Sequence, residues 1–245
     1  MKKPDCAWSF SDLSKVEKNG LKVMSTFSCG GGSTMGYKLA GCDVIAANDI
    51  DPEMEWHYKL NHNPKNYFLC PIRELLTKEL PEELFNLDIL DGSPPCSTFS
   101  MAGSREKAWG KDKHFREGQA KQVLSDLFFD FLEVAERLNP KVIIAENVKG
   151  IITGNAKGYT KMIMAKLKEI GYKPQLFLVN AADCGVPQTR QRVFFCALRN
   201  DIEKGKMELG PKHKWITVKD AINDLGKLTP SEKKDTSPTG IDFKA

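Results

Sequence analysis

The sequence reveals its architecture most clearly at Leu21–Gly36, which reads LKVMSTFSCGGGSTMG. The apolar stretch Leu21–Ser28 is typical of a β-strand, and three consecutive glycines follow it closely. Glycines between a first strand and a first helix let backbone N–H groups approach a ligand without interference from a Cβ atom. Gly30, Gly32 and Gly36 nearly match a dinucleotide fingerprint, although their spacing differs by one residue. The turn indicates a nucleotide-like ligand but does not identify it.

Apolar, β-like runs alternate with segments of helical period along the chain, which favours a parallel sheet covered by helices on both faces. The expected strands are Leu21–Ser28, Asp43–Asp49, Asn66–Cys70, Leu87–Gly92, Lys141–Val148, Gln175–Asn180 and Arg192–Leu198. Helices are expected over Val123–Leu138 and Thr160–Ile170, and a short one within Ile216–Leu225. No segment of helical length separates the last two apolar runs, so they predict a β-hairpin that closes the sheet.

Composition limits the class of protein. The 245 residues are 41% apolar and 28% charged, values close to those of ordinary globular domains. The sequence has neither a run of 18 apolar residues nor an apolar core near its start, so we expect a cytoplasmic protein. Its seven cysteines form no Cys-x-x-Cys pair, so neither a disulfide scaffold nor a metal site is expected. The net charge of +4 is weak evidence for an anionic partner.

An acidic residue follows the second expected strand. Asp49 stands 17 residues after Gly32, where an ionised carboxylate could accept hydrogen bonds from the two hydroxyls of a ribose. A nucleoside-bearing cofactor is therefore expected, and NAD and S-adenosylmethionine are both eligible. A tight turn with an acid at a strand end, without any ligand, is the alternative.

A cysteine follows the fourth expected strand. The segment Leu87–Ser100 reads LDILDGSPPCSTFS and places Cys96 just past the carboxyl end of that strand, the edge where open α/β sheets bind ligands. The two prolines before it stiffen the backbone, and the long polar loop Ser97–Gln122 after it is typical of a lid or a binding segment. A nucleophilic thiol is favoured here over a buried, inert one. A zinc deaminase is excluded, because Phe99 stands where its second cysteine would be.

Two further segments place charged residues at expected strands: Glu146 lies toward the end of one, and Arg190 and Arg192 lie at the start of another. Glu146 ends a fully apolar run, and a carboxylate at such a place can share a proton with a ring nitrogen. Arg190 and Arg192, in the segment QTRQR, would lie on one face if they belong to a strand, and could hold a thiolate, a base carbonyl or a phosphate. A helix-capping Glu-Asn pair and an exposed edge with paired charges are the structural alternatives.

In this order the segments resemble the cytosine-C5 DNA methyltransferase family over about residues 21–225. Phe27–Gly32 is similar to the cofactor-binding motif of that family, GSPPCSTFS to its nucleophile motif, ENV at 146–148 to its acid motif and QTRQR to its arginine motif. The resemblance implies an α/β fold with a doubly wound, mostly parallel seven-stranded sheet of the S-adenosylmethionine-dependent methyltransferase (Rossmann-like) type, ending in a β-hairpin. It also implies a catalytic domain over residues 1–199 and the incomplete start of a target-recognition or connecting region over 200–245.

The resemblance implies a role for each catalytic residue. Cys96 would attack C6 of a flipped-out cytosine, and Glu146 would hold N3 and the exocyclic amine of the base. Arg192 would contact the base O2, and Arg190 would help position the thiolate. This chemistry agrees with the residue types, because C5 becomes nucleophilic only after addition at C6. Both carbons are out of reach while the base is stacked.

The resemblance also implies the ligands and the residues that bind them. For S-adenosylmethionine these are Phe27, Ser28, Cys29, Gly30, Gly32, Asp49, Ile50, Ile72, Ser93, Pro95 and Leu127. For double-stranded DNA they are Ser97, Ser100, Arg105, Lys107, Lys111, Lys113 and Arg116. Two positions depart from the family pattern: Cys29 replaces a glycine, and Pro71 replaces an acid that meets the adenine amine.

Several alternatives remain open from the sequence. The C-terminal motifs of the family are not found, which predicts a split subunit or a truncated chain whose recognition region comes from a second polypeptide. The enzyme would be of the restriction-modification or phage type, in the cytoplasm and associated with the nucleoid. A tRNA cytosine-C5 methyltransferase, a catalytically idle DNA-binding relative and, last, an NAD oxidoreductase are the other candidate functions.

Overall fold

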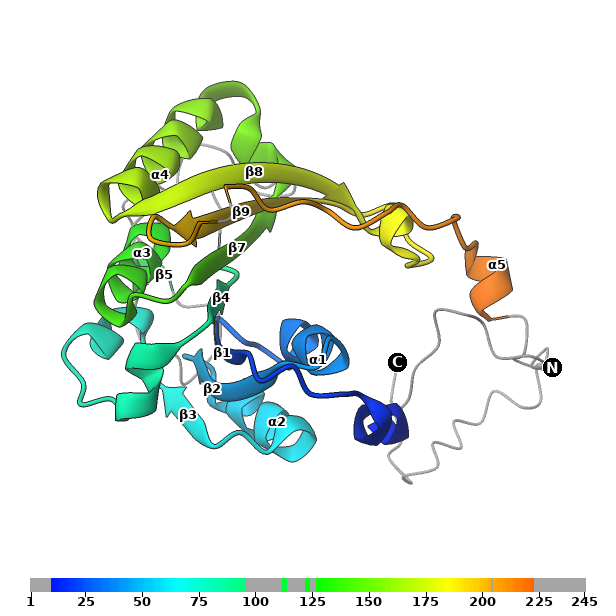
Figure 1. The fold of residues 1–245 in the computed structure, drawn as a ribbon, viewed down its shortest axis with the longest axis horizontal. Helices are drawn as coiled ribbons and strands as arrows, with labels where there is room; N and C mark the ends of the chain where they lie inside the picture. The colour runs from blue at the N-terminus through cyan, green and yellow to red at the C-terminus, as the bar shows by residue number, and fades with distance from the viewer. Residues whose placement is uncertain (1–9, 96–111, 114–121, 124–126, 204, 223–245) are drawn as a thin grey trace.

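A seven-stranded sheet of order β3-β2-β1-β4-β7-β9-β8 forms the centre of the molecule (Figure 1). The computed structural model describes residues 10–95, 112–113, 122–123, 127–203 and 205–222. The strands are β1 (Lys22–Thr26), β2 (Asp43–Asp49), β3 (Asn66–Leu69), β4 (Ile89–Gly92), β7 (Val142–Val148), β8 (Tyr172–Asn180) and β9 (Gln191–Arg199). A separate antiparallel pair joins β5 (Asp112–Lys113) to β6 (Gln122–Val123).

The sheet is parallel from β3 to β7, and only β9 runs against its neighbours β7 and β8. The chain builds β1, β2 and β3 outward in one direction and then returns to place β4 on the other side of β1. Ligands of doubly wound sheets bind at the carboxyl ends of the strands beside such a reversal. The predicted sheet and its closing hairpin are confirmed, and they direct attention to the ends of β1 and β4.

Helices cover both faces of the sheet. α1 (Gly32–Leu39) and α2 (Pro52–His62) lie on one side, and α3 (Leu127–Leu138) and α4 (Lys157–Glu169) lie on the other (Figure 1). A short helix, α5 (Val218–Ala221), lies apart from the sheet. The 3-10 turns are η1 (Phe10–Lys15), η2 (Ile72–Leu76), η3 (Glu82–Asn86), η4 (Lys149–Ile152), η5 (Gly154–Ala156) and η6 (Ala181–Cys184).

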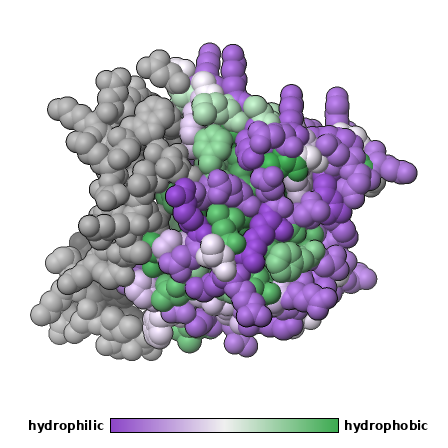
Figure 2. Space-filling view, turned by 90° about the vertical axis from the view of Figure 1, so that its left-hand side faces the viewer, coloured by the Kyte–Doolittle hydropathy of each residue, from purple (hydrophilic) through white to green (hydrophobic). Residues whose placement is uncertain are grey.

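The core lies between the sheet and α3. The apolar stripe of this helix is fully buried, because side chains three and four residues apart share one face; its members include Phe128, Phe131, Leu132 and Leu138. Hydrophilic and hydrophobic residues are intermixed on the side of the molecule that lies at the left of Figure 1 (Figure 2). None of the described helices is long and apolar enough to cross a membrane.

Three elements differ at their starts by three or more residues from those expected from the sequence. The helix expected over Val123–Leu138 is described from Leu127, and Val123 itself pairs with Asp112 in the β5–β6 ladder. The helix α4 begins at Lys157 rather than Thr160, since the turn η5 runs directly into it.

The strand β8 is longer than the expected Gln175–Asn180, and it includes Pro174. It occupies the edge of the sheet, where a residue without an N–H group is tolerated.

Candidate active site

The glycine loop, Phe27–Gly31, connects β1 to α1 at the switch point of the sheet. Phe27, Cys29 and Gly31 all have positive φ, at 52°, 46° and 88°. A Cβ atom on Gly31 would lie 2.1 Å from His62 Nε2, whereas one on Gly30 would meet nothing within 4 Å. The loop therefore packs on α2 along one side and is open on the other. That open side presents backbone to a ligand.

Cys29 fills a position that favours glycine on conformational grounds. Its thiol is exposed, and its Sγ atom lies 3.4 Å from Met54 Sδ on α2. Its backbone N–H donates to Asp49 Oδ2 at 2.7 Å. These contacts hold a non-glycine residue in the left-handed conformation, so the departure from the family pattern does not disrupt the loop.

Asp49 ends β2 and organises the turn beside the glycine loop. Its Oδ1 atom accepts hydrogen bonds from the N–H groups of Ile50 and Asp51, at 2.8 and 3.0 Å, in addition to the bond from Cys29 at Oδ2. A carboxylate has about four acceptor positions. Among the described residues three of them are taken, which leaves one on Oδ2 for a ligand hydroxyl.

Two buried hydroxyl groups belong to the loop itself and to the nearby strand β3. Ser28 Oγ and the Tyr67 hydroxyl have no hydrogen-bond partner among the described residues. Burial, with the charge of Asp49, raises the pKa of the Tyr67 hydroxyl, and the Ser28 side chain counteracts part of this rise. Unpaired buried hydroxyls are costly, and polar ligand atoms would satisfy them. Together with the open backbone and the free position on Asp49, they suit a polar nucleoside cofactor.

The opposite side of the site carries a partly buried ion pair. Arg192 Nε donates to Glu146 Oε1 at 2.8 Å, and the side chains of Arg192 and Glu146 are 23% and 28% exposed. Arg192 in β9 pairs in register with Val148, two residues beyond Glu146 in β7. The two side chains therefore share one face of the sheet as diagonal neighbours. The pair fixes a carboxylate and a guanidinium at the carboxyl end of β7.

Asn147 connects this pair to the loop after β4. Its Nδ2 atom donates to the carbonyl oxygen of Pro94 at 3.1 Å, and its side chain is buried. The sequence prediction of site residues did not include it, although it is the central residue of the ENV segment. Cys96, two residues beyond Pro94, lies outside the described residues. Asn147 thus anchors the backbone that leads to the predicted nucleophile.

The remaining predicted residues occupy varied positions. Ser93 and Pro95 lie on the loop after β4, and Ile50 follows β2. Ile72 and Leu127 are 2% and 3% exposed and belong to the hydrophobic core.

Only Arg192 belongs to β9, so the condition under which the two arginines would share one face of a strand is not met. Arg190 is exposed and precedes β9 by one residue, because the strand begins at Gln191. The predicted DNA contacts Ser97, Ser100, Arg105, Lys107, Lys111 and Arg116 lie outside the described residues, and Lys113 is described only as a strand residue of β5.

Comparison with known proteins identifies relatives over most of the chain. The family model described as C-5 cytosine-specific DNA methylase matches residues 21–242. The type II methyltransferase M.FnuDI of Fusobacterium nucleatum is 33% identical over 226 residues, covering 91% of this chain and 60% of the relative. The type II methyltransferase M.NgoPII of Neisseria gonorrhoeae is 34% identical over 213 residues, covering 84% of this chain and 58% of the relative. The chain spans about three fifths of the length of these relatives.

Solved structures show the same fold. A DNA modification methyltransferase encoded within an Escherichia coli prophage superposes with a TM-score of 0.64 at 23% identity, over 85% of this chain and 56% of that one. DNMT2 of Spodoptera frugiperda superposes with a TM-score of 0.55 at 26% identity, over 77% of this chain and 54% of that one. The sheet order and the helices around it are therefore those of a methyltransferase fold.

Proposed function

The chain belongs to the C-5 cytosine-specific DNA methylase family, and from this premise we propose that it transfers a methyl group from S-adenosylmethionine to C5 of cytosine in DNA. The observation that carries the proposal is the Glu146–Arg192 pair, held 2.8 Å apart beside a loop that Asn147 anchors through Pro94. A carboxylate and a guanidinium so placed can bind the polar edge of a pyrimidine. The next loop residues carry Cys96.

In this proposal the thiolate of Cys96 forms a bond to C6 of the flipped cytosine, and the electron pair of the C5–C6 double bond moves to C5. Glu146 holds N3 and the exocyclic amine, which draws electrons from C6 and favours the attack. Arg192 donates to O2 of the base, and Arg190, two residues before it, helps position the thiolate. C5 would then accept the methyl group, which leaves S-adenosylhomocysteine. A base would remove the C5 proton, and the electron pair of that C–H bond would re-form the C5–C6 double bond and expel Cys96 as a thiolate.

The glycine loop would hold the cofactor. Asp49 accepts a ribose hydroxyl at its free acceptor position, and the open backbone at Gly30 and Gly32 faces the methionine part. Ser28 gains a partner for its buried hydroxyl. Bound S-adenosylmethionine supplies an electrophilic methyl group on a sulfonium ion. The other predicted cofactor contacts, including Phe27, Ile50 and Pro95, remain part of the proposal.

The partners follow from the same proposal. Double-stranded DNA would meet the segment 97–116, whose Lys and Arg side chains can neutralise phosphates. A second polypeptide is the partner that we propose for target recognition. In that division residues 1–199 form the catalytic domain, and 200–245 lead toward the recognition region. The enzyme would act in the cytoplasm on the DNA of a prokaryotic or phage-infected cell.

A mechanism-based trap tests the proposal. The chain is incubated with S-adenosylmethionine and duplexes that carry 5-fluorocytosine, alone and together with the product of the neighbouring gene. Fluorine at C5 cannot leave as a cation, so the enzyme remains covalently bound to the base. We expect an adduct that is lost in Cys96→Ser and retained in Cys184→Ser, a matched change of an exposed cysteine in η6. An adduct with 5-fluorocytosine tRNA alone would overturn DNA as the substrate, and no adduct with either would overturn the activity.

A further inference from the structure

Asp91 is a buried carboxylate for which the proposed reaction has no use. It lies in β4, five residues before Cys96, and is 5% exposed. Asp91 is not among the site residues predicted from the sequence, although it stands inside an otherwise apolar strand. Charged groups are seldom buried so completely unless their environment compensates them.

Hydroxyl groups from two other elements surround this carboxylate. Ser25 Oγ donates to Asp91 Oδ2 at 3.0 Å, and the Tyr37 hydroxyl donates to Asp91 Oδ1 at 3.1 Å. Ser25 Oγ also lies 3.3 Å from Ser33 Oγ. Since the single hydrogen of Ser25 is directed at Asp91, Ser33 must be the donor in that second contact. The carboxylate is thus the final acceptor of a small hydrogen-bonded cluster.

The cluster joins three elements that meet at the site. Ser25 is the register partner of Asp91 in the parallel pair β1–β4, and Thr26 Oγ1 donates to the Asp91 carbonyl at 2.9 Å. Ser33 and Tyr37 lie four residues apart and therefore face the same side of α1. β1 and α1 flank the glycine loop, whereas β4 leads to Cys96.

Two side-chain contacts hold the first turn of α1 among the described residues: the Ser33 hydroxyl joins the Asp91 cluster, and Thr34 Oγ1 lies 2.7 Å from the Tyr58 hydroxyl of α2. The N-cap of α1, Gly31, is in the left-handed conformation and makes no side-chain hydrogen bond. Ser33 is the second residue of the helix, so the Asp91 charge lies below the first turn, where the partial positive charge of a helix is concentrated. The link from Asp91 to α1 therefore fixes the end of the helix that adjoins the glycine loop.

The ionised form of this carboxylate is costly. Burial raises the pKa of Asp91 to about 6, and the charge of Glu146 in β7 adds to the rise, although the nearby hydroxyl groups of Ser33, Ser25 and Tyr37 oppose it. Above this pH the folded protein carries a buried charge that an uncharged side chain would avoid. A costly buried charge beside a binding site is a candidate for a functional role.

We propose that Asp91 is a positioning residue that holds α1 and the glycine loop against the strand leading to the nucleophile. This inference rests on the proposed function, because it takes S-adenosylmethionine as the ligand of the loop. Asp91 touches neither the cofactor nor the base in this scheme. It acts through Ser25, Ser33 and Tyr37, and so ties α1 and the glycine loop to β4.

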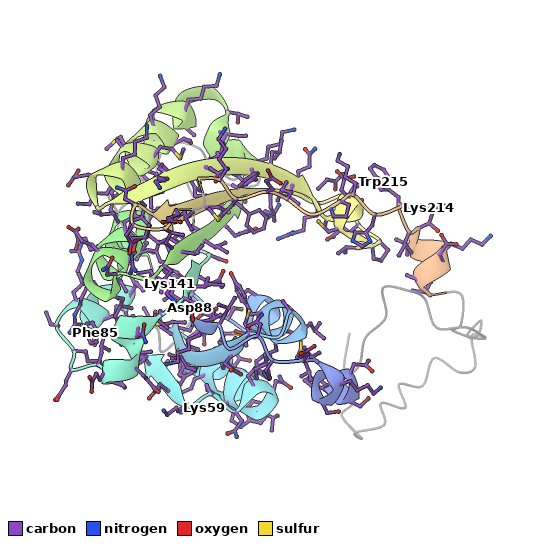
Figure 3. The ribbon with its side chains drawn as sticks, viewed as in Figure 1. Lys59, Phe85, Asp88, Lys141, Lys214 and Trp215 are labelled. Atoms are coloured by element: carbon purple, nitrogen blue, oxygen red, sulfur yellow. The ribbon has the colours of Figure 1, made fainter. Side chains whose placement is uncertain are left out.

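The test compares Asp91→Asn with the matched change Asp88→Asn. Asp88 immediately precedes the same strand and is also partly buried, but it lies at the end away from the glycine loop and pairs with Lys141 at 2.7 Å (Figure 3). Calorimetric titration at pH 8 measures the affinity of each protein for S-adenosylmethionine and for the product S-adenosylhomocysteine, which lacks the sulfonium charge. Thermal unfolding at the same pH measures stability.

For Asp91→Asn we expect both affinities to fall about tenfold, the worth of one charge-assisted hydrogen bond. Its thermal midpoint should not fall, because the buried charge is gone. For Asp88→Asn we expect the reverse: a lower thermal midpoint, since an ion pair and a bond from the Lys22 N–H are weakened, with both affinities unchanged. If the role of Asp91 were only structural, Asp91→Asn would behave like Asp88→Asn, with a lower thermal midpoint and unchanged affinities.

The inference is overturned if Asp91→Asn binds both ligands as the wild type does, or if only S-adenosylmethionine, the cationic ligand, loses affinity. Should Asp91→Asn fail to fold, Tyr37→Phe removes one donor of the same link and is expected to weaken both ligands roughly fivefold. Unchanged affinities in Tyr37→Phe would then overturn it. Failure of the wild type to bind S-adenosylmethionine would instead contradict the proposed function.

Discussion

The glycine-loop side and the base side of the candidate site hold their functional groups by different means. On the loop side, Asp49 is fixed by three backbone N–H groups, and the fold of Gly31 over His62 leaves no room for a side chain. On the base side, Glu146 and Arg192 hold each other through side chains that remain partly exposed. Changes on the loop side should therefore alter conformation and stability, whereas changes on the base side should alter chemistry and leave the fold intact.

The largest effect is expected on the base side. Glu146→Gln keeps the shape of the side chain but removes the charge and the proton that it exchanges with the base. We expect the rate of methyl transfer to fall about 10²- to 10⁴-fold, the range for a general acid-base residue. The thermal midpoint should stay close to that of the wild type, because the Arg192 partner is partly exposed.

The matched control is Glu169→Gln on α4, whose carboxylate pairs with Lys166 on the surface. It should leave the rate unchanged. If Glu146→Gln lost stability in proportion to its rate, the two sides of the site would not differ in the way proposed.

The second prediction concerns the loop side. Gly31→Ala places a Cβ atom 2.1 Å from His62 Nε2 at a φ of 88°. We expect a loss of at least about 2 kcal/mol in the free energy of unfolding, from the left-handed backbone and the displaced imidazole. Affinity for S-adenosylmethionine should fall with it.

Gly30→Ala is the matched control, since its Cβ atom would meet nothing within 4 Å and its φ is not positive. Its stability should stay within about 0.5 kcal/mol of the wild type. Combining Gly31→Ala with His62→Ala removes the imidazole that the new Cβ atom would meet, so the double variant should recover part of the lost free energy of unfolding. Equal stability of the two single variants would show that His62 does not limit the loop.

The sequence predicted the sheet well because each strand is a short apolar run ended by a turn or a charged residue. It also located Asp49 and Glu146, whose positions at strand ends are visible in the linear pattern. Their assigned roles remain predictions, as does that of Cys96, which lies outside the described residues.

The contacts that hold the site together could not be predicted in this way. Asn147 meets Pro94 across 53 residues, and Tyr37 meets Asp91 across 54. Linear patterns record whether a residue favours burial or a turn, but not which distant group it will meet. The sequence also placed Val123 in a helix and did not predict that this residue pairs with Asp112.

A smaller effect is expected at Asn147, which joins the base side of the site to the loop after β4. Asn147→Ala removes the hydrogen bond to the Pro94 carbonyl and leaves a buried acceptor unpaired. Such a loss is worth about 1–3 kcal/mol, and we expect it to be divided between stability and a roughly tenfold slower rate of adduct formation with 5-fluorocytosine duplexes. Asn61→Ala on α2, which breaks an exposed bond to the His57 carbonyl, is the control and should change neither. An unaltered rate of adduct formation would mean that Asn147 does not place the loop.

The smallest effect concerns pH and comes from the buried imidazole beneath the glycine loop. Burial, with the nearby Lys38 charge, lowers the pKa of His62, although the carbonyl groups of Gly30 and Gly31 oppose this. The unfolded chain therefore binds a proton more readily than the folded protein, and stability contributed by neutral His62 is lost as pH falls below about 6.5. One such group can change the free energy of unfolding by at most about 1.4 kcal/mol per pH unit. Asp91 acts in the opposite direction: its raised pKa makes the free energy of unfolding fall as pH rises from about 4 to 6. The pH dependence of the wild-type stability therefore combines both groups. The difference in unfolding free energy between the wild type and His62→Gln isolates the imidazole, and it should shrink as pH is lowered from 7 to 5. A difference that stays constant over that range would mean that the loop does not hold His62 in its neutral form.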